Sequence, residues 1–255
     1  FSTLNLNGYD FAILDCGLSE DSKDFFKQKN IQVLECKWDI DVPSYKVRGR
    51  EYLKAQFSRF FLDLYFPGYE NYIWMDSDTW IACPNTFDYY IQGSNQRGFA
   101  ITPQVDRASP KLVNIKWFMN IPSKINSINF KNILNAGCFA YNKKYDGMKI
   151  IKKNLNTASR KGRLFGSDQV ALAISLFEDN LDFELLPSYC NWLCEHHMPK
   201  FSIDKNTFVE PYIPNHNIGV MHLAGLDEDR SGNVLHKIST TDNKIIEKSL
   251  RYKSI

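Results

Sequence analysis

The 255-residue sequence lacks any apolar run close to the length of about 20 residues that a membrane-spanning helix needs, so no segment is predicted to cross a bilayer. It also lacks an excess of one charge. Its 31 basic and 29 acidic residues leave a formal net charge of +2, which excludes a bulk electrostatic role on nucleic acid. It contains no internal repeat and no low-complexity segment, which excludes repeat architectures.

The sequence has few cysteines, and their spacing is irregular. Six cysteines in a chain of this length do not make a disulfide framework, and we expect reduced, mostly buried thiols of an intracellular protein. The predicted location is therefore the cytoplasm, with the membrane surface as a second option. A 44% hydrophobic content is enough for a full core, and we expect one domain over residues 1–255 with a C-terminal extension at 226–255.

An acid pair in an aromatic, apolar stretch organises the chain. The run 72–75 predicts a buried strand, and Asp76, Ser77 and Asp78 follow at its carboxyl end. In open α/β sheets ligands bind at that end of the strands. Two carboxylates so close repel each other unless a cation lies between them, which favours a divalent metal that also binds substrate phosphates. An ordinary Asp turn explains the same three residues.

The remaining pattern predicts an α/β fold with a mixed, mainly parallel sheet flanked by helices. The expected strands, read as short apolar runs, are 11–14, 31–34, 98–102, 138–141, 183–186 and 219–223. The expected helices are 22–29, a long one at 50–66, 86–92, 145–155 and one capped by Ser167. Residues 108–131 read as an irregular loop over the site.

Four motifs in order carry a resemblance to a known family. They are FSRFFLDLYFPGYENYIWMDSDTWI, LNAGCFAYNKK, SDQVAL and VMHLAG. Together they resemble glycosyltransferase family 8, the retaining GT-A enzymes that include glycogenin and bacterial lipopolysaccharide galactosyltransferases. The resemblance implies a Rossmann-like GT-A fold and transfer of a hexose from a nucleotide-diphosphate sugar, expected to be a UDP-sugar. The implied acceptor is a glycan, a lipid-linked sugar or a protein.

The resemblance also implies roles for individual residues. Asp76, Asp78 and His222 would hold Mn²⁺, or Mg²⁺, on the donor diphosphate. Asp168 and Gln169 would be the catalytic pair, and retention of the anomeric configuration would follow from transfer on one face of the sugar. The implied donor-binding residues are Arg59, Asp76, Ser77, Asp78, Asn135, Ala136, Gly137, His222 and Gly225.

Arg59, the stretch 135–137 and His222 also have a plainer explanation. Arg59 reads equally as a solvated charge on a helix. The stretch 135–137 reads as a tight turn. His222 lies in an apolar strand, where a histidine is usually structural.

The sequence departs from the family in two places. The family begins with a strand that holds the base and ribose, whereas this chain is expected to lack it. The family's His-x-x-Gly is followed by a Lys, whereas Gly225 is followed by Leu226 and the acidic run 227–229, with Arg230 as the nearest basic residue. An acidic patch there would repel a diphosphate.

Two further segments carry residues that suggest a special role. The run 190–197, CNWLCEHH, has the residues of a zinc site but not the spacing, which favours an acceptor-pocket wall. Residues 243–253 predict an amphipathic helix packed on the domain, with contact to a membrane surface as the alternative.

Two other functions remain open from the sequence. One is a catalytically silent module that binds a nucleotide sugar or a glycan. The other is a phosphatase of the haloacid dehalogenase type, which also carries Asp-x-Asp after a strand but wants Thr or Val where Trp80 stands.

Overall fold

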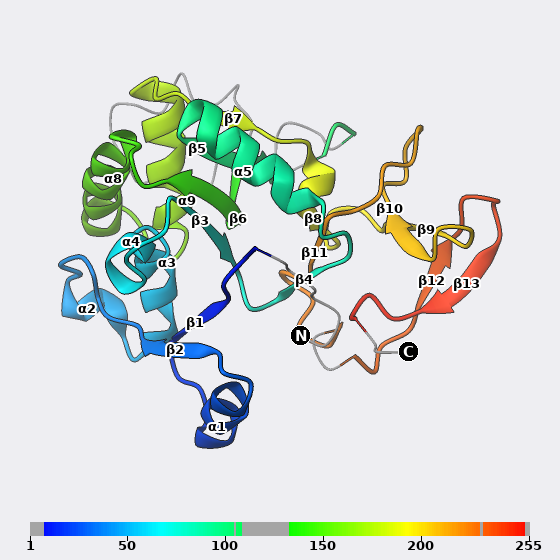
Figure 1. The fold of residues 1–255 in the computed structure, drawn as a ribbon, viewed down its shortest axis with the longest axis horizontal. Helices are drawn as coiled ribbons and strands as arrows, with labels where there is room; N and C mark the ends of the chain where they lie inside the picture. The colour runs from blue at the N-terminus through cyan, green and yellow to red at the C-terminus, as the bar shows by residue number, and fades with distance from the viewer. Residues whose placement is uncertain (1–7, 105, 109–132, 230–231, 253–255) are drawn as a thin grey trace. The chain divides into compact units, whose positions relative to one another are not determined.

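The structure is a computed structural model that describes residues 8–104, 106–108, 133–229 and 232–252. The predicted loop at 108–131 therefore lies almost wholly outside the described residues. The chain divides into two compact units (Figure 1). Unit 1 comprises Phe1–Tyr72, Leu112–Lys131 and Lys143–Asp182. Unit 2 comprises Ile73–Lys111, Asn132–Asn142 and Phe183–Ile255.

Unit 1 opens with the predicted strand–helix–strand motif. Strand β1 (Ala12–Asp15) pairs in parallel with β2 (Gln32–Glu35), and α1 (Glu20–Gln28) connects them. The side chain of Ser19 caps α1 by accepting the N–H of Ser22. The first strand is half-buried rather than fully buried as expected, because β2 is its one partner among the described strands.

The predicted long helix at 50–66 is wrong. The chain instead forms three short pieces, η1 (Glu51–Lys54), α3 (Ala55–Ser58) and α4 (Leu62–Tyr65). Phe61 leaves the helical region at φ −123°, and its N–H donates to the carbonyl of Ser58, so the turn tightens and the helix stops. Helical spacing identified the buried residues up to Phe60, but the break turns Leu64 out, where it is 69% exposed.

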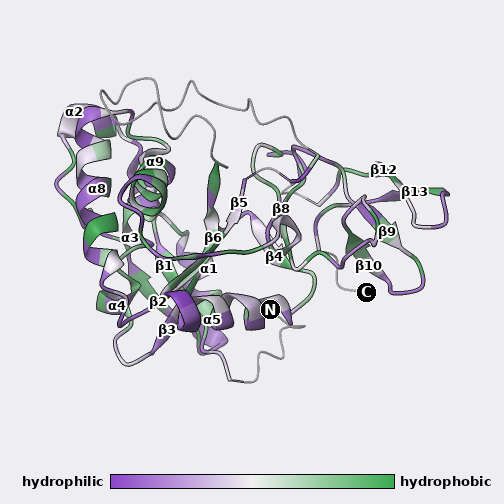
Figure 2. Ribbon diagram, turned by 90° about the horizontal axis from the view of Figure 1, so that it is seen from above, coloured by the Kyte–Doolittle hydropathy of each residue, from purple (hydrophilic) through white to green (hydrophobic). Residues whose placement is uncertain are grey.

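Two helices close unit 1. Helix α8 (Gly147–Lys161) buries one face and exposes the other, as the alternating colours along it in Figure 2 show. Helix α9 (Ser167–Ala173) continues into the π-turn η2 (Ile174–Glu178). Ser167 is not the cap that the sequence predicted. Gly166, at φ 79°, takes that position, and the buried Ser167 hydroxyl has no partner. A short helix, α2 (Ser44–Val47), lies beside the end of α8.

Unit 2 contains a four-stranded sheet in the order β3-β6-β5-β7. Its strands are β3 (Asn71–Met75), β5 (Phe99–Pro103), β6 (Leu134–Asn142) and β7 (Glu184–Leu185). Helix α5 (Thr86–Arg97) packs along β5 and β6 (Figure 1). Strand β6 is buried along nearly its whole length, and β5 pairs with it antiparallel and with β7 in parallel.

A second sheet of unit 2 has the order β4-β11-β8. Strand β11 (Val220–His222) is antiparallel to β4 (Thr79–Ile81) and parallel to β8 (Trp192–Leu193). The single turn η3 (Ser188–Cys190) precedes β8. All three residues of β11 are buried, so its position in the middle of this sheet is fixed by packing as well as by hydrogen bonds.

Two hairpins complete unit 2. Strands β9 (Lys200–Ser202) and β10 (Thr207–Val209) form one, and β12 (His236–Ser239) and β13 (Ile245–Lys248) form the other. The predicted C-terminal helix is therefore wrong. Asn243 takes a left-handed conformation at φ 63°, which turns the chain back into an antiparallel strand.

The mixed α/β class that the sequence predicted is confirmed, with strand pairs in both directions. All six cysteines are free and four are buried, as expected. Among the described helices, none is both long and apolar enough to cross a membrane.

Candidate functional site

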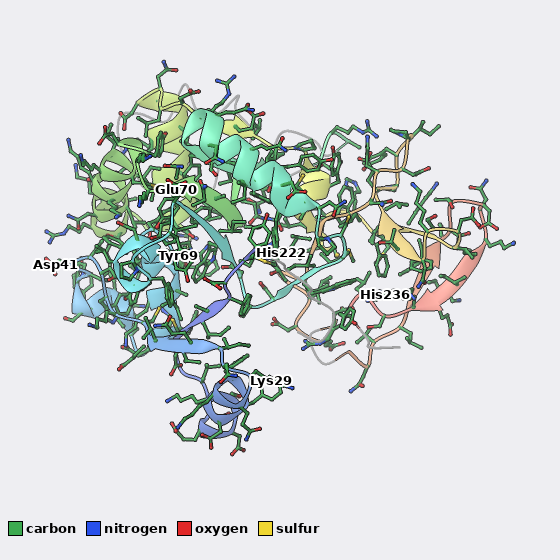
Figure 3. All side chains as sticks on the ribbon, in the orientation of Figure 1. Lys29, Asp41, Tyr69, Glu70, His222 and His236 are labelled. Carbon is green, nitrogen blue, oxygen red and sulfur yellow. The ribbon has the colours of Figure 1, made fainter. Side chains whose placement is uncertain are left out.

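Unit 2 brings three predicted metal ligands together. Asp76 and Asp78 follow β3, and His222 is the last residue of β11. Strand β4 begins at Thr79 and pairs with β11 so that Thr79 faces His222, which places the histidine beside the acid pair. One ligand atom from each of the three residues lies within 4.8 Å of the others. Figure 3 labels His222 at the end of its strand.

Backbone hydrogen bonds hold the acid pair in place. The N–H of Asp76 donates to the carbonyl of Gly137 at 2.8 Å, and the N–H of Leu223 donates to that of Asp78 at 2.9 Å. The carbonyl of Asp76 accepts from the N–H and the hydroxyl of Thr79. The indole of Trp74 donates to Oδ1 of Asp76 at 2.7 Å. The segment is therefore a turn closed by the main-chain carbonyl of Asp76, and its two carboxylates belong to the three-residue cluster.

A neighbouring asparagine sets the tautomer of the histidine. Nε2 of His222 faces Oδ1 of Asp78 at 3.4 Å, and Nδ1 faces Oδ1 of Asn191 at 3.1 Å. An amide oxygen can only accept a hydrogen bond, so Nδ1 carries a proton, and Nε2 is the ring nitrogen that faces the carboxylates. This is the arrangement that a metal-binding histidine needs, with its other ring nitrogen held by a hydrogen bond.

The missing side chain of Gly137 leaves space at the same cluster. A Cβ built there would lie 2.3 Å from Cε1 of His222, 2.9 Å from Oδ1 of Asn135 and 3.1 Å from Oδ2 of Asp76. The N–H of Gly137 donates to Oδ1 of Asn135 at 2.7 Å. Glycine is required here by close approach of other groups, and the turn explanation from the sequence does not account for that crowding.

The donor set fits a divalent cation. Two partly buried carboxylates and an imidazole suit Mn²⁺, and Mg²⁺ is compatible with the carboxylates. Without a cation the two acids repel each other at short range in a partly desolvated place. The cradle at Gly137 and the orientation of His222 agree with the same ion.

The other predicted residues of unit 2 differ in their surroundings. Ser77 is exposed, and Ala136 is buried within β6. Gly225 has φ 77°, and a Cβ there would lie 2.6 Å from the carboxyl carbon of Glu195. The side chain nearest to Gly225 is thus a carboxylate and not a lysine or arginine, and its negative charge is unfavourable for binding a phosphate.

One acid of the run after Gly225 is bound by a histidine. Asp229 is buried and its Oδ1 lies 2.5 Å from Nε2 of His236. It is therefore turned into the protein and not toward a ligand. Arg230, the basic residue that the sequence offered in place of the family's Lys, lies outside the described residues.

Unit 1 holds three more of the predicted residues. Nη1 of Arg59 lies 3.3 Å from Oδ2 of Asp168, and both side chains are 6% exposed. The explanation of Arg59 as a solvated surface charge is wrong, because α3 packs that side of the helix into the unit. Gln169 follows Asp168 in the first turn of α9 and is half-buried.

Sequence reasoning missed Asn191 as a site residue. It lies within the run 190–197, for which the sequence favours an acceptor-pocket wall over a zinc site. Burial raises the pKa of Cys190 to about 11 and that of Cys194 to about 12, as is typical of structural thiols in a core. Among the described residues, the Asp76, Asp78 and His222 cluster is the one that groups ligands for a metal.

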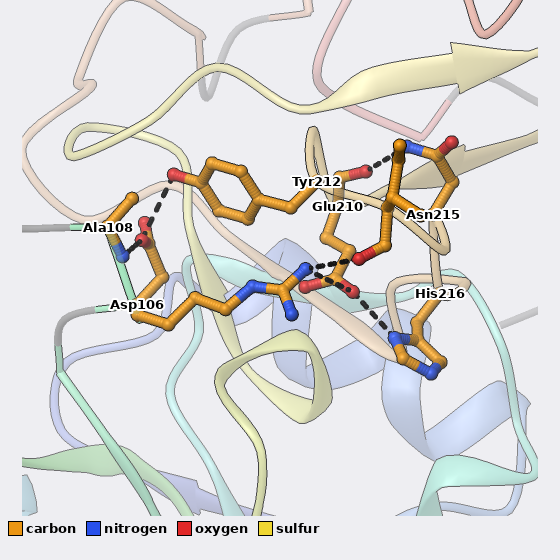
Figure 4. Close-up of polar contacts among 8 residues, drawn as sticks. Asp106, Ala108, Glu210, Tyr212, Asn215 and His216 are labelled. Carbon is orange, nitrogen blue, oxygen red and sulfur yellow. Dashed lines mark hydrogen bonds and ion pairs between the residues drawn. The ribbon is translucent and has the colours of Figure 1, made fainter.

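A separate polar network in unit 2 joins two buried acids to aromatic and histidine side chains (Figure 4). The hydroxyl of Tyr212 donates to Oδ1 of Asp106 at 3.0 Å, and His197 binds the other oxygen. Burial, and then Asp106, raises the pKa of Tyr212 to about 12. The second acid, Glu210, pairs with His216 at 2.6 Å. Because each acid is satisfied by its own partners, the network reads as structural.

Comparison with known proteins adds little. No protein-family model matches the chain, and no curated protein matches it. Among solved structures, it is similar to a glycosyltransferase involved in the glycosylation of the major capsid of PBCV-1, with 12% identity, 89% of this chain and 100% of that chain covered, and a TM-score of 0.47. A similarity at that level is too low to assign a fold family or a function.

Proposed function

We propose that this protein is a metal-dependent glycosyltransferase with a GT-A fold, which moves a hexose from a nucleotide-diphosphate sugar to an acceptor hydroxyl. The observation that carries the proposal is the cluster of Asp76, Asp78 and His222, built from segments far apart in the sequence. The four sequence motifs that resemble family 8 support the same assignment. The donor is proposed to be a UDP-sugar.

The residues of the cluster have distinct proposed tasks. Asp76, Asp78 and Nε2 of His222 would hold Mn²⁺ or Mg²⁺, with Asn191 orienting the imidazole. A bound divalent ion supplies charge stabilisation for a diphosphate leaving group. Asn135, Ala136 and Gly137 would let the backbone of β6 approach the donor, together with the exposed Ser77 and with Gly225.

Arg59, Asp168 and Gln169 are proposed to bind the transferred sugar. The ion pair between Arg59 and Asp168 supports a positioning role, because a carboxylate held by a guanidinium is a weak nucleophile and a good acceptor for hydroxyl groups. We therefore propose retention through transfer on one face of the sugar, with Gln169 as a second amide contact. A sugar adduct trapped on Asp168 would contradict this part of the proposal.

Calorimetry with UDP in the presence and absence of Mn²⁺ tests the proposal. We expect UDP to bind with Mn²⁺ and to lose measurable binding in EDTA or in Asp78→Ala, while the thermal unfolding of the metal-free variant stays close to that of the wild type. The exposed Asp88→Ala is the matched control in unit 2. Equal UDP affinity in wild type and Asp78→Ala would refute the metal assignment.

One observation favours a second candidate, a nucleotide-sugar or glycan-binding protein without turnover. Glu195 stands next to Gly225, where a phosphate would need positive charge. A radiolabelled-donor assay separates the two, because a silent module binds the donor without transferring or hydrolysing it.

A further inference from the structure

Unit 1 contains a cavity of about 630 Å³, which is in the range of small-molecule sites. One wall comes from α2 and the turn after it, and the other from the residues that follow α8. Its lining carries four basic side chains and no acidic one, and it also carries three aromatic rings. The lining includes Tyr45, Lys46, Arg48, Arg50, Tyr52 and Arg163.

The lysine in this lining has a structural task. Nζ of Lys46 donates to the carbonyls of Ser159, Arg160 and Gly162 at 2.8, 2.5 and 2.8 Å. A lysine has three donors, so all of them are used on the exposed carbonyls at the end of α8. Lys46 joins the two walls of the cavity and has no donor left for a ligand.

The arginines are different. Arg50 uses its Nε and Nη2 on the carbonyls of Val47 and Lys46, and Arg48 uses only its Nε, on that of Tyr45. Arg163 is exposed. In the part of the chain that the structure describes, no carboxylate pairs with any of the three. The acid nearest in sequence, Glu51, is bound to Lys54 at 3.0 Å.

The backbone presents Arg48 in an unusual conformation. Arg48 has φ 50° and Gly49 has φ 72°, so two successive residues are left-handed. That conformation is costly for a residue with a side chain, and it is typical of positions that place a functional group. The turn holds the Arg48 side chain on the lining of the cavity.

Exposed aromatic rings accompany these charges. Tyr45 is 69% and Tyr52 57% exposed, and they stand on α2 and η1. Large rings so exposed beside a cavity are typical of surfaces that pack against the face of a ligand ring. Phe165, on the other wall, is 51% exposed.

The cavity is joined to the predicted sugar-binding pair of the same unit. The side chain of Gln56 donates to the carbonyl of Leu164, which lines the cavity, and accepts the N–H of Gly166. Gly166 directly precedes α9, whose first turn carries Asp168. Gln56 lies on α3, and Arg59 directly follows the last residue of that helix. The cavity wall and the Arg59–Asp168 pair thus share one hydrogen-bonded support.

We propose that this cavity binds a phosphorylated sugar, with the phosphate on Arg48 and Arg163 and the sugar ring against Tyr45 and Tyr52. Arginine matches phosphate oxygens with paired donors, and three unneutralised arginines in one cavity favour an anion. The inference rests on the proposed function in one respect: in a glycosyltransferase, this phosphorylated sugar would be the acceptor. The binding site itself is argued independently of that function. The chain as a whole is nearly neutral, so the positive charge of the cavity is a local feature. The protein therefore does not present a general polyanion-binding surface.

Titration with glucose 6-phosphate tests the inference, with glucose and inorganic phosphate as comparison ligands. We expect glucose 6-phosphate to bind the wild type, to bind more weakly as salt rises, and to lose about tenfold or more in affinity in Arg163→Gln. Tyr45→Ala should weaken glucose 6-phosphate but leave inorganic phosphate unchanged. Lys153→Ala, an exposed charge on α8 outside the cavity, should change neither.

Three results would overturn the inference. Equal affinity for glucose and glucose 6-phosphate would assign a neutral sugar, and equal effects of Arg163→Gln and Lys153→Ala would show unspecific attraction. Binding to phosphatidylglycerol vesicles that depends on Arg163, without binding of glucose 6-phosphate, would assign a lipid headgroup. Calorimetry of Mn²⁺ on Arg163→Gln should match the wild type, so a failed metal site is distinguishable from a failed sugar site.

Discussion

Nδ1 of His222 lies 3.1 Å from Oδ1 of Asn191, although His222 ends β11 and Asn191 lies 31 residues earlier, between η3 and β8. The amide oxygen fixes the proton on Nδ1 and leaves Nε2 directed at Asp78. A residue that the sequence did not single out therefore decides which nitrogen of the histidine is available.

Replacing Asn191 by Ala should lower Mn²⁺ affinity by about 10- to 100-fold, because the imidazole loses the partner that fixes its tautomer and its orientation. Asn191→Asp keeps an acceptor and should retain more of the affinity than Asn191→Ala. The exposed Asn85→Ala in the same unit should leave the affinity unchanged. Calorimetry with Mn²⁺ alone measures all three, and equal affinities of Asn191→Ala and Asn191→Asp would contradict the tautomer argument.

Gly137→Ala should abolish Mn²⁺ binding, because the new Cβ would lie 2.3 Å from a ring carbon of His222. Gly93→Ala is the control. Its Cβ would lie 2.9 Å from those of Ala100 and Glu184, in the same unit but outside the metal cluster. Both variants should lower the melting temperature, while Gly93→Ala should keep the Mn²⁺ affinity of the molecules that remain folded. Normal Mn²⁺ affinity in Gly137→Ala would show that the cluster can rearrange.

Asp168→Asn should lower the free energy of unfolding by about 3 to 5 kcal/mol, because it leaves the buried guanidinium of Arg59 without its charged partner. The exposed pair of Lys149 and Asp146 is the comparison, and Lys149→Ala should leave the free energy of unfolding nearly unchanged because solvent screens that pair. Urea unfolding measures both. If Asp168→Asn lowers the free energy of unfolding no more than Lys149→Ala does, the ion pair of Arg59 and Asp168 contributes no more to stability than an exposed pair.

Activity of Asp168→Asn has to be measured on the folded fraction. We expect its turnover to fall more than its affinity for the nucleotide, since contacts to the sugar that strengthen in the transition state affect kcat. Gln169→Ala should behave in the same way with a smaller loss of stability, because its side chain is half-buried and carries no charge.

Asp15→Asn should make stability less dependent on acid pH. Burial pushes the pKa of Asp15 up, but hydrogen bonds from the N–H groups of Leu18 and Gly17 and from Lys23 outweigh it, so the pKa is lowered. A lowered folded-state pKa gives stability that is present above the usual Asp value of about 3.9 and is lost as the pH falls through the folded value. The wild type should be about 1 kcal/mol more stable than Asp15→Asn at pH 7, with the difference shrinking below pH 4.

Thermal unfolding from pH 7 to pH 2.5 checks this prediction. The exposed Asp24→Asn, also in the first part of unit 1, should run parallel to the wild type across that range. A constant difference between Asp15→Asn and the wild type at all pH values would exclude the ionised carboxylate as its source.

Features that depend only on neighbours along the chain could be predicted from the sequence. The strand before Asp76 and the strand–helix–strand motif at Ala12–Glu35 were predicted, because short apolar runs and helical spacing are local signals. The helix predicted at 86–92 is present and runs five residues further, to Arg97. The acid pair was predicted as a metal site for the same reason, since both carboxylates follow one strand.

Tertiary structure decided the rest. His222 meets Asp78 because of the register between β4 and β11, which no local pattern encodes. The helix expected at 50–66 breaks at Phe61, and the helix expected at 243–253 became a strand that pairs with β12. The sequence left open whether Arg59 is a solvated charge or a functional residue. In the folded chain it is buried against Asp168. The spacing of apolar residues along the sequence predicts which residues face the core. Which side chain each of them contacts in the core depends on long-range packing.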